Sequence, residues 1–146
     1  MKAYNYSFVK SYYNEDTKET IATINTDLGH FTGRAKCHPD EEHPSYIFGG
    51  HIAEGRALEK YLRSERRVAK LQQKAIQDLY NAVACMNGFD EDNMYASKMR
   101  RALYEKAAEI NHIDTLIAQL KQRMAHLCTE RDVLLKSAVF NKHPKS

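Results

Sequence analysis

The residues with the clearest chemical potential are two cations that flank a small residue, Arg34 and Lys36. In an extended strand alternate residues share a face, which puts both cations on one side with His30 and Thr32. The opposite side is apolar and small around Gly33. Charged side chains on a strand usually face solvent, and this is one interpretation. The other is that Arg34 and Lys36 face an anionic ligand.

A second candidate is the double glycine Gly49-Gly50, which precedes a long predicted helix that begins at His51. Two prolines and two glycines within residues 38–50 argue against regular structure and predict an ordered loop. At a helix start, Gly50 would let a ligand approach backbone N–H groups, where the helix dipole favours negative charge. A double glycine is also a simple flexible joint, so both interpretations stay open.

A longer basic feature runs along the predicted first helix. Its six cations recur in alternating four- and three-residue steps, so they share one helical face. They are Arg56, Lys60, Arg63, Arg67, Lys70 and Lys74. Solvation is the default for such a face, and the alternatives are binding of nucleic acid or of a phosphorylated small ligand.

The sequence offers little that predicts catalysis. It has no glycine-rich phosphate fingerprint, no serine or cysteine nucleophile in a recognisable setting and no metal-binding motif. The acidic run Asp40–Glu42 is typical of solvated surface. Three cysteines, an odd number, predict reduced thiols rather than a disulfide framework. We therefore expect a protein without enzymatic activity, cofactor or metal.

These side chains must be positioned by an α+β chain of 146 residues that forms a single domain. Residues 1–50 predict an antiparallel β-meander and a loop, because apolar and polar residues alternate there. The three predicted strands are Tyr4–Phe8, Thr20–Thr26 and Phe31–Cys37. Residues 51–139 predict an antiparallel two-helix hairpin with its break at Met86–Met94, and residues 140–146 a polar tail.

The second helix carries the cleaner heptad seam, although Lys106 and Arg131 interrupt it. Antiparallel pairing about the break sets Leu62 near Ala118 and makes the second helix overhang the first. Several apolar residues on the overhang then need cover from the small sheet or from another copy: Val133, Leu135, Val139 and Phe140. We therefore expect a homo-oligomer, either a dimer or a larger assembly.

Composition indicates a cytosolic protein. No apolar run approaches the roughly 20 residues of a transmembrane helix, and Met1–Tyr6 is too polar for a signal peptide. We expect no membrane partner. The formal net charge of +3 is slight, so nucleic acid is not the partner that we favour.

Two stretches resemble a family of small phage proteins. They are residues 23–40, with the sequence TINTDLGHFTGRAKCHPD, and residues 49–57, with the sequence GGHIAEGRA, followed by two long helices. This order is similar to the anti-Thoeris sponge family, the first-described Thoeris anti-defence proteins, from phages of Gram-positive bacteria. The resemblance covers the chain from the second predicted strand through the helical hairpin.

The resemblance implies phage counter-defence in the host bacterial cytosol without turnover. Family members sequester a cyclic ADP-ribose-type signal made by a TIR enzyme, and some also hold cyclic oligonucleotides. They are multimeric, which implies self-assembly here, with a hexamer among the possible forms. By the same resemblance, Arg34 and Arg56 are candidate phosphate-binding residues. Phe89 and Asn93 are the nearest candidates for the aromatic residue and asparagine that the family uses near the interhelical turn.

Such a ligand agrees with the chemistry of the chain. Diphosphate requires arginine forks and backbone donors, and adenine requires a π-face, which Tyr80, Phe89 or Tyr95 could provide beside Arg100 and Arg101. The length of the helix separates the sheet end from the turn end, so one hairpin cannot unite them. The ends could meet between antiparallel subunits or form two sites. The alternative functions are a nucleic-acid- or protein-binding inhibitor, resembling an anti-CRISPR protein, and a structural coiled-coil adaptor.

Overall fold

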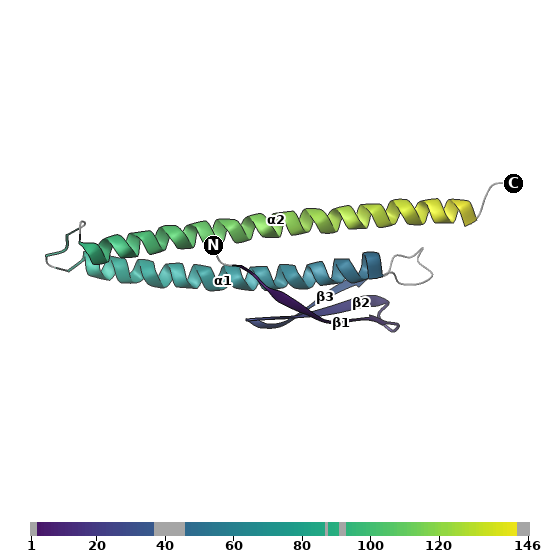
Figure 1. Ribbon diagram of the computed structural model, residues 1–146, viewed down its shortest axis with the longest axis horizontal. Coiled ribbons are helices and arrows are strands. Elements are labelled where there is room, and N and C mark those ends of the chain that lie inside the picture. Colours follow the sequence, from purple (N-terminus) through teal and green to yellow (C-terminus); the bar gives the residue numbers. More distant parts are fainter. Residues whose placement is uncertain (1–2, 37–45, 87, 91–92, 143–146) are drawn as a thin grey trace.

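The chain forms a long helical hairpin with a small sheet against one of its helices (Figure 1). The computed structural model describes residues 3–36, 46–86, 88–90 and 93–142. A three-stranded antiparallel sheet precedes two long helices, so the predicted α+β architecture is confirmed. Residues 38–45 of the predicted loop lie outside the described residues.

The strands follow the order of the sequence: β1 (Tyr6–Asn14), β2 (Glu19–Thr26) and β3 (Gly29–Lys36). In the first turn, the Asn14 side chain accepts hydrogen bonds from the backbone N–H groups of Asp16 and Thr17, an arrangement that asparagine favours. In the second, Gly29 adopts a φ of 113°, which is unfavourable for residues with a Cβ. The predicted meander is confirmed, although β1 begins at Tyr6 instead of Tyr4 and continues to Asn14 instead of ending at Phe8. Cys37 of the third predicted strand lies outside the described residues.

Strand β3 has the two faces that its alternation predicts. Gly33 is buried, whereas Arg34 and Lys36 are exposed. The buried face lies on α1 (His51–Ala84). A side chain at Gly33 would collide with the helix backbone at Ala53, so only glycine permits this close approach. The sheet therefore rests directly on the backbone of the first helix.

Helix α1 runs antiparallel to α2 (Met94–Lys142). Arg66 Nε donates to Asp114 Oδ1 across the pair at 2.5 Å, which marks the register between the two helices. This register agrees with the prediction that Leu62 lies near Ala118. The predicted break between the helices is also in the correct place.

The helix α2 is longer than α1 and extends beyond its start (Figure 1). It continues to Lys142, so the predicted end near Val139 is too early and part of the predicted polar tail is helical. The physical reason is that neither glycine nor proline occurs between the start of α2 and Pro144. The predicted overhang is confirmed.

Helix α1 is buried on two faces. The core between the helices consists of Leu62, Ala69, Ile110, Ile113 and Ile117. The core between α1 and the sheet consists of Ala22, Ile24, Ala35, Ile52, Ala53, Ala57 and Tyr61. Sheet and α2 lie on different sides of α1, and the sheet leaves the turn half of the hairpin uncovered (Figure 1).

Helix α1 begins at His51, as predicted, but the residues directly before it are also helical. A π-helical turn, η1 (Tyr46–Gly50), leads directly into the helix, and Gly50 has φ −63° and ψ −47°. Gly50 is therefore helical and buried, rather than the exposed first residue of a helix. Because Gly50 is buried in this helical turn, its backbone is not the open helix start that the sequence suggested, and its contact with an anionic ligand stays a prediction.

Candidate ligand-binding site

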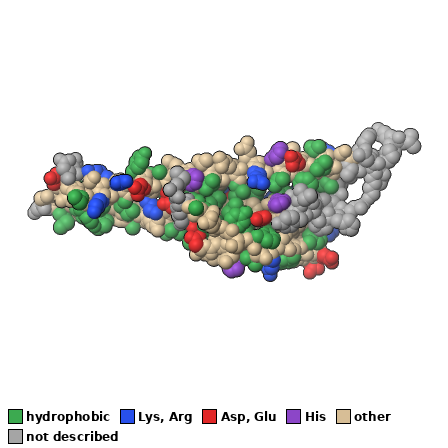
Figure 2. Space-filling view, in the orientation of Figure 1, with side chains coloured by type: hydrophobic (Ala, Val, Ile, Leu, Met, Phe, Trp, Pro, Cys, Tyr) green, Lys and Arg blue, Asp and Glu red, His purple; other side chains and the backbone are tan. Residues whose placement is uncertain are grey.

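The interhelical turn encloses a cavity of about 260 Å³. It unites three residues that the sequence singled out, Phe89, Asn93 and Tyr95. The remaining lining residues are Val83, Met86, Gly88, Asp90 and Ala96. Apolar side chains cluster at the surface of this end of the hairpin (Figure 2). We call this cavity the turn pocket.

Aromatic rings form one side of the turn pocket. The Phe89 ring meets the Tyr80 ring edge-on, with 6.0 Å between centroids and an interplanar angle of 88°. Tyr95 lies on the first turn of α2 with 54 % of its surface exposed. An exposed aromatic face is suited to stacking with a planar base, because every nucleobase presents a π-face.

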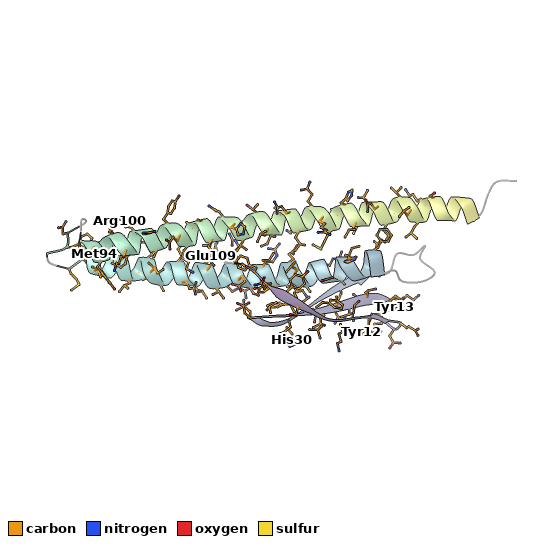
Figure 3. The ribbon with its side chains drawn as sticks, in the orientation of Figure 1. Tyr12, Tyr13, His30, Met94, Arg100 and Glu109 are labelled. Atoms are coloured by element: carbon orange, nitrogen blue, oxygen red, sulfur yellow. The ribbon has the colours of Figure 1, made fainter. Side chains whose placement is uncertain are left out.

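A cation is held beside these rings. Arg100 Nη1 donates a hydrogen bond to the Tyr80 hydroxyl oxygen at 3.3 Å, and Arg100 lies at the turn end of the hairpin (Figure 3). Its neighbour Arg101 forms an ion pair with Glu105 at 3.3 Å instead. Of the two predicted arginines, Arg100 is therefore the one that the fold connects to the turn pocket.

Asn93 has a structural role that its position explains. Its side-chain oxygen accepts the backbone N–H of Tyr95 at 2.7 Å, and its carbonyl oxygen accepts the N–H of Ser97 at 3.0 Å. Asn93 is thus the N-cap of α2. Its side-chain amide N–H₂ group is a donor and is not used by this cap. Gly88, which precedes Asn93 in the interhelical turn, has a φ of 80° that favours glycine and helps the chain to reverse there.

Arg34, Lys36 and Arg56 form a second cluster at the free edge of β3. Arg56 Nη1 donates to the carbonyl oxygen of Arg34 at 2.6 Å, and Lys60 Nζ donates to that of Thr32 at 2.8 Å. The Arg34 guanidinium lies 3.8 Å from a Glu19 carboxylate oxygen. The fold thus makes Arg34 and Arg56 neighbours.

The two clusters lie far apart. About 36 Å of helix separates Arg56 from Tyr80, at 1.5 Å per residue. Figure 3 shows the same separation, with Met94 and Arg100 at the turn and Tyr12 and His30 on the sheet. One chain therefore does not unite the two clusters, as the helical lengths predict.

A further hollow, separate from the turn pocket and from the cations beside β3, was not predicted. It lies between the N-terminal segment and both helices, has a volume of about 270 Å³, and is lined by Tyr4, Tyr6, Leu58, Leu62, Leu116, Gln119, Leu120 and Arg123. Tyr6 Oη donates to Glu54 at 3.2 Å, and Tyr4 Oη donates to Glu109 at 3.3 Å. No local pattern could reveal it, because Tyr4 and Glu109 are 105 positions apart.

Burial controls the ionisation of two phenols near this hollow. Desolvation, followed by the charge and hydrogen bond of Glu109, raises the pKa of Tyr4 from 10.0 to about 12. Desolvation and the Asp27 hydrogen bond of 2.9 Å likewise raise the pKa of Tyr61. Both hydroxyls remain protonated donors near neutral pH. Their role here is to fasten the N-terminal segment and the β2–β3 turn to the helices.

Within the described part of the chain, no group of three His, Cys, Asp or Glu side chains could hold a metal ion. Cys85 is an exposed free thiol and Cys128 a half-buried one, whereas Cys37 lies outside the described residues. None of the described helices is both long enough and apolar enough to cross a membrane.

Comparison with known proteins adds no family to this geometry. No protein-family model, curated protein or solved structure matches the chain. The side chains that the fold brings together at the turn and along α1 therefore carry the functional inference.

Proposed function

We propose that this protein binds a cyclic ADP-ribose-type signalling nucleotide in the turn pocket and sequesters it without cleavage, as a phage counter-defence sponge. The observation that carries the proposal is the meeting of Phe89, Asn93 and Tyr95 in one cavity, with Arg100 linked to it through Tyr80. These residues come from both helices and from the turn between them.

The chemistry of the turn pocket suits a nucleotide. Phe89 and Tyr95 offer rings that can stack with adenine, a contact of about 1–3 kcal/mol per base in other proteins. The Asn93 amide N–H₂ can donate to ring nitrogens or hydroxyls. Arg100 supplies the planar, charged fork that recognises phosphate oxygens. The rings, the amide and the arginine thus suit the base, the hydroxyl groups and the phosphates of such a ligand.

Capture without cleavage is supported by the kinds of residue that line the pocket. No serine, cysteine, histidine or lysine occurs among the described lining residues. Asp90 and Tyr95 are the lining residues with nucleophile or base chemistry, and no serine–histidine or cysteine–histidine pair is among the described lining residues. Aromatic and amide groups bind substrates by contact, and they hold a ligand without changing its bonds.

The size of the pocket supports a role for a second copy. Ligand sites usually have volumes of about 300–1,000 Å³, and the turn pocket, at about 260 Å³, falls just below that range. A cyclic dinucleotide-sized ligand would therefore leave part of its surface outside one chain. Assembly of two or more copies, which the bare apolar overhang of α2 also supports, would supply the missing wall.

Calorimetric titration with cyclic ADP-ribose isomers tests the proposal. We expect stoichiometric binding by the unmodified protein, and at least about tenfold weaker binding by Phe89→Ala, because a stacked base contributes about 1–3 kcal/mol. Tyr104→Ala is the matched control, since the Tyr104 ring on α2 is 78 % exposed and does not line the pocket. Unchanged binding by Phe89→Ala, or absence of heat with every isomer, would contradict the proposal.

A further inference from the structure

A basic groove runs along α1 beyond the part that the sheet covers. Its volume is about 430 Å³, and its lining residues are Arg63, Arg66, Arg67, Lys70, Leu71 and Lys74. Arg56 and Lys60 continue the same helical face toward β3. We call these eight residues the basic surface of α1. The six cations of the predicted row, which are those of this surface other than Arg66, are all exposed, as a shared helical face requires.

Acidic neighbours offset only part of this charge. Arg63 forms an ion pair with Glu59 at 3.2 Å, and Lys74 lies 3.5 Å from Asp78. Arg66, which also lines the groove, is paired with Asp114 of α2. No ion pair or hydrogen bond joins Arg67 or Lys70 to another residue in the described part of the chain. The middle of the basic surface therefore carries uncompensated positive charge.

The end of the basic surface near the sheet is held in place. Arg56 and Lys60 donate to main-chain carbonyl oxygens of β3, as described above. A carbonyl is neutral, so both cations keep their full charge while their motion is restricted. Fixed cations lose less conformational entropy when an anion binds than free ones do. This arrangement favours a binding role over simple solvation.

We propose that the basic surface of α1 binds the phosphate backbone of double-stranded DNA independently of base sequence. The row from Arg56 to Lys74 is straight and roughly 27 Å long, at 1.5 Å per residue. That length spans about eight base pairs at 3.4 Å each, so a helix lying along the duplex reaches phosphates of both strands where each backbone crosses its basic face. A rigid, straight row of cations is complementary to a rigid duplex, and this contact is distinct from nucleotide capture at the turn.

Two other polyanionic surfaces fit less well. Single-stranded nucleic acid is normally bound by cations together with aromatic platforms, and no aromatic residue lines the groove among the described residues. A membrane-surface helix inserts a free apolar face beside its cations. The apolar faces of α1 are already buried against α2 and the sheet, and Leu71 is the single apolar residue of the groove.

Fluorescence anisotropy with a labelled random-sequence duplex, across a series of salt concentrations, tests this inference. The unmodified protein should bind with a dissociation constant of about 10⁻⁴–10⁻⁶ M near physiological salt, and more tightly at lower salt. The double variant Arg67→Glu, Lys70→Glu should bind at least about tenfold more weakly. Its salt dependence, as log K against log salt, should be shallower by about two, one for each lost phosphate contact.

Lys121→Glu with Lys136→Glu is the matched control, because it changes the net charge equally at exposed positions on α2. We expect it to keep most of the duplex affinity, and we expect both double variants to unfold at the temperature of the unmodified protein. Absence of duplex binding at low salt, equal loss in both double variants, or equally effective competition by polyglutamate would overturn the inference. The Arg67, Lys70 variant should still bind cyclic ADP-ribose, so the two proposals succeed or fail separately.

Discussion

At the scale of single residues, Tyr4 fastens the N-terminal segment across the helical hairpin. Its hydroxyl donates to Glu109 on α2, and its ring stacks on His112 with 6.3 Å between centroids. The same ring contacts the core on both sides of α1. This phenol, with its raised pKa, contributes to stability only while it is protonated.

The first prediction concerns alkaline pH. Because the folded pKa of Tyr4 is about 12 and its unfolded value about 10, its contribution to stability is complete below pH 10. The contribution is lost as the pH rises from about 10 to about 12, since the unfolded chain releases the proton more readily. Tyr4→Phe should therefore reduce the fall in unfolding free energy across this range, measured by urea denaturation.

Neutral pH provides the control for this variant. Loss of the Glu109 hydrogen bond should cost Tyr4→Phe about 0.5–1.5 kcal/mol at pH 7. Tyr104→Phe, on an exposed ring of α2, should leave stability unchanged. If Tyr4→Phe keeps the alkaline slope of the unmodified protein, the Tyr4 hydroxyl is not coupled to folding.

Site residues were predictable only where they are close in sequence. Phe89, Asn93 and Tyr95 flank one turn, so the position of that turn was enough to unite them. The sequence also showed that Lys106 interrupts the apolar seam of α2, but it did not show which partners would satisfy its charge. Lys106 Nζ donates to Gln72 on the other helix at 2.6 Å and to Glu109 at 3.0 Å. The contact with Gln72 crosses between the helices, and the heptad pattern alone does not show which side chain of α1 accepts the Lys106 hydrogen bond.

At the scale of elements, two glycines govern how closely α1 approaches its neighbours. A Cβ at Gly33 would meet the backbone of α1 at Ala53 and Ala57. A Cβ at Gly55 would lie 2.8 Å from Met124 Sδ, the end of a flexible side chain. Backbone cannot move aside without shifting the whole helix, whereas a methionine can change rotamer.

These contacts predict opposite tolerances for the same substitution. Gly33→Ala should destabilise the protein by about 3 kcal/mol or more, because overpacking costs roughly 1–3 kcal/mol even where side chains can adjust. Gly55→Ala should stay within about 1 kcal/mol of the unmodified protein, since the helical preference for alanine over glycine offsets the methionine contact. Thermal unfolding of the two variants checks this, and equal midpoints would contradict the close packing of β3 on α1.

The elements themselves were largely predictable, because their signals are local. Alternation separated the two faces of β3, and heptad spacing identified the seam of α2, whose Ile110, Ile113 and Ile117 are buried. The helical turn before α1 was not predictable. Gly49-Gly50 resembles a joint in sequence, yet both residues are helical because burial against the sheet compensates for their flexibility.

At the scale of the whole molecule, the overhang of α2 exposes two large apolar side chains among the residues that the structure describes. Val133 is 61 % exposed and Leu134 57 % exposed, and the sheet lies on another side of α1 (Figure 1). The sequence left two candidates to cover such residues, the sheet or another copy. In the structure the sheet does not cover these side chains, so we still expect self-association through the overhang.

Light scattering after gel filtration tests self-association. The unmodified protein should have at least twice the 16.8 kDa mass of one chain. Val133→Glu with Leu134→Glu should shift the mass toward 16.8 kDa, because two charges cannot be buried in an apolar contact without great cost. Ser137→Glu, an exposed polar position on the same overhang, is the control and should leave the mass unchanged. A monomeric unmodified protein would contradict the expectation.

Nucleotide capture is the central claim, and native mass spectrometry tests it most directly. The protein is incubated with a cyclic ADP-ribose isomer, the complex is weighed, and the nucleotide is then released by denaturation and weighed again. The account predicts an assembly that carries the ligand and releases it with its mass unchanged, and loss of the ligand in Phe89→Ala. An assembly free of nucleotide, or release of a hydrolysed product, would contradict it.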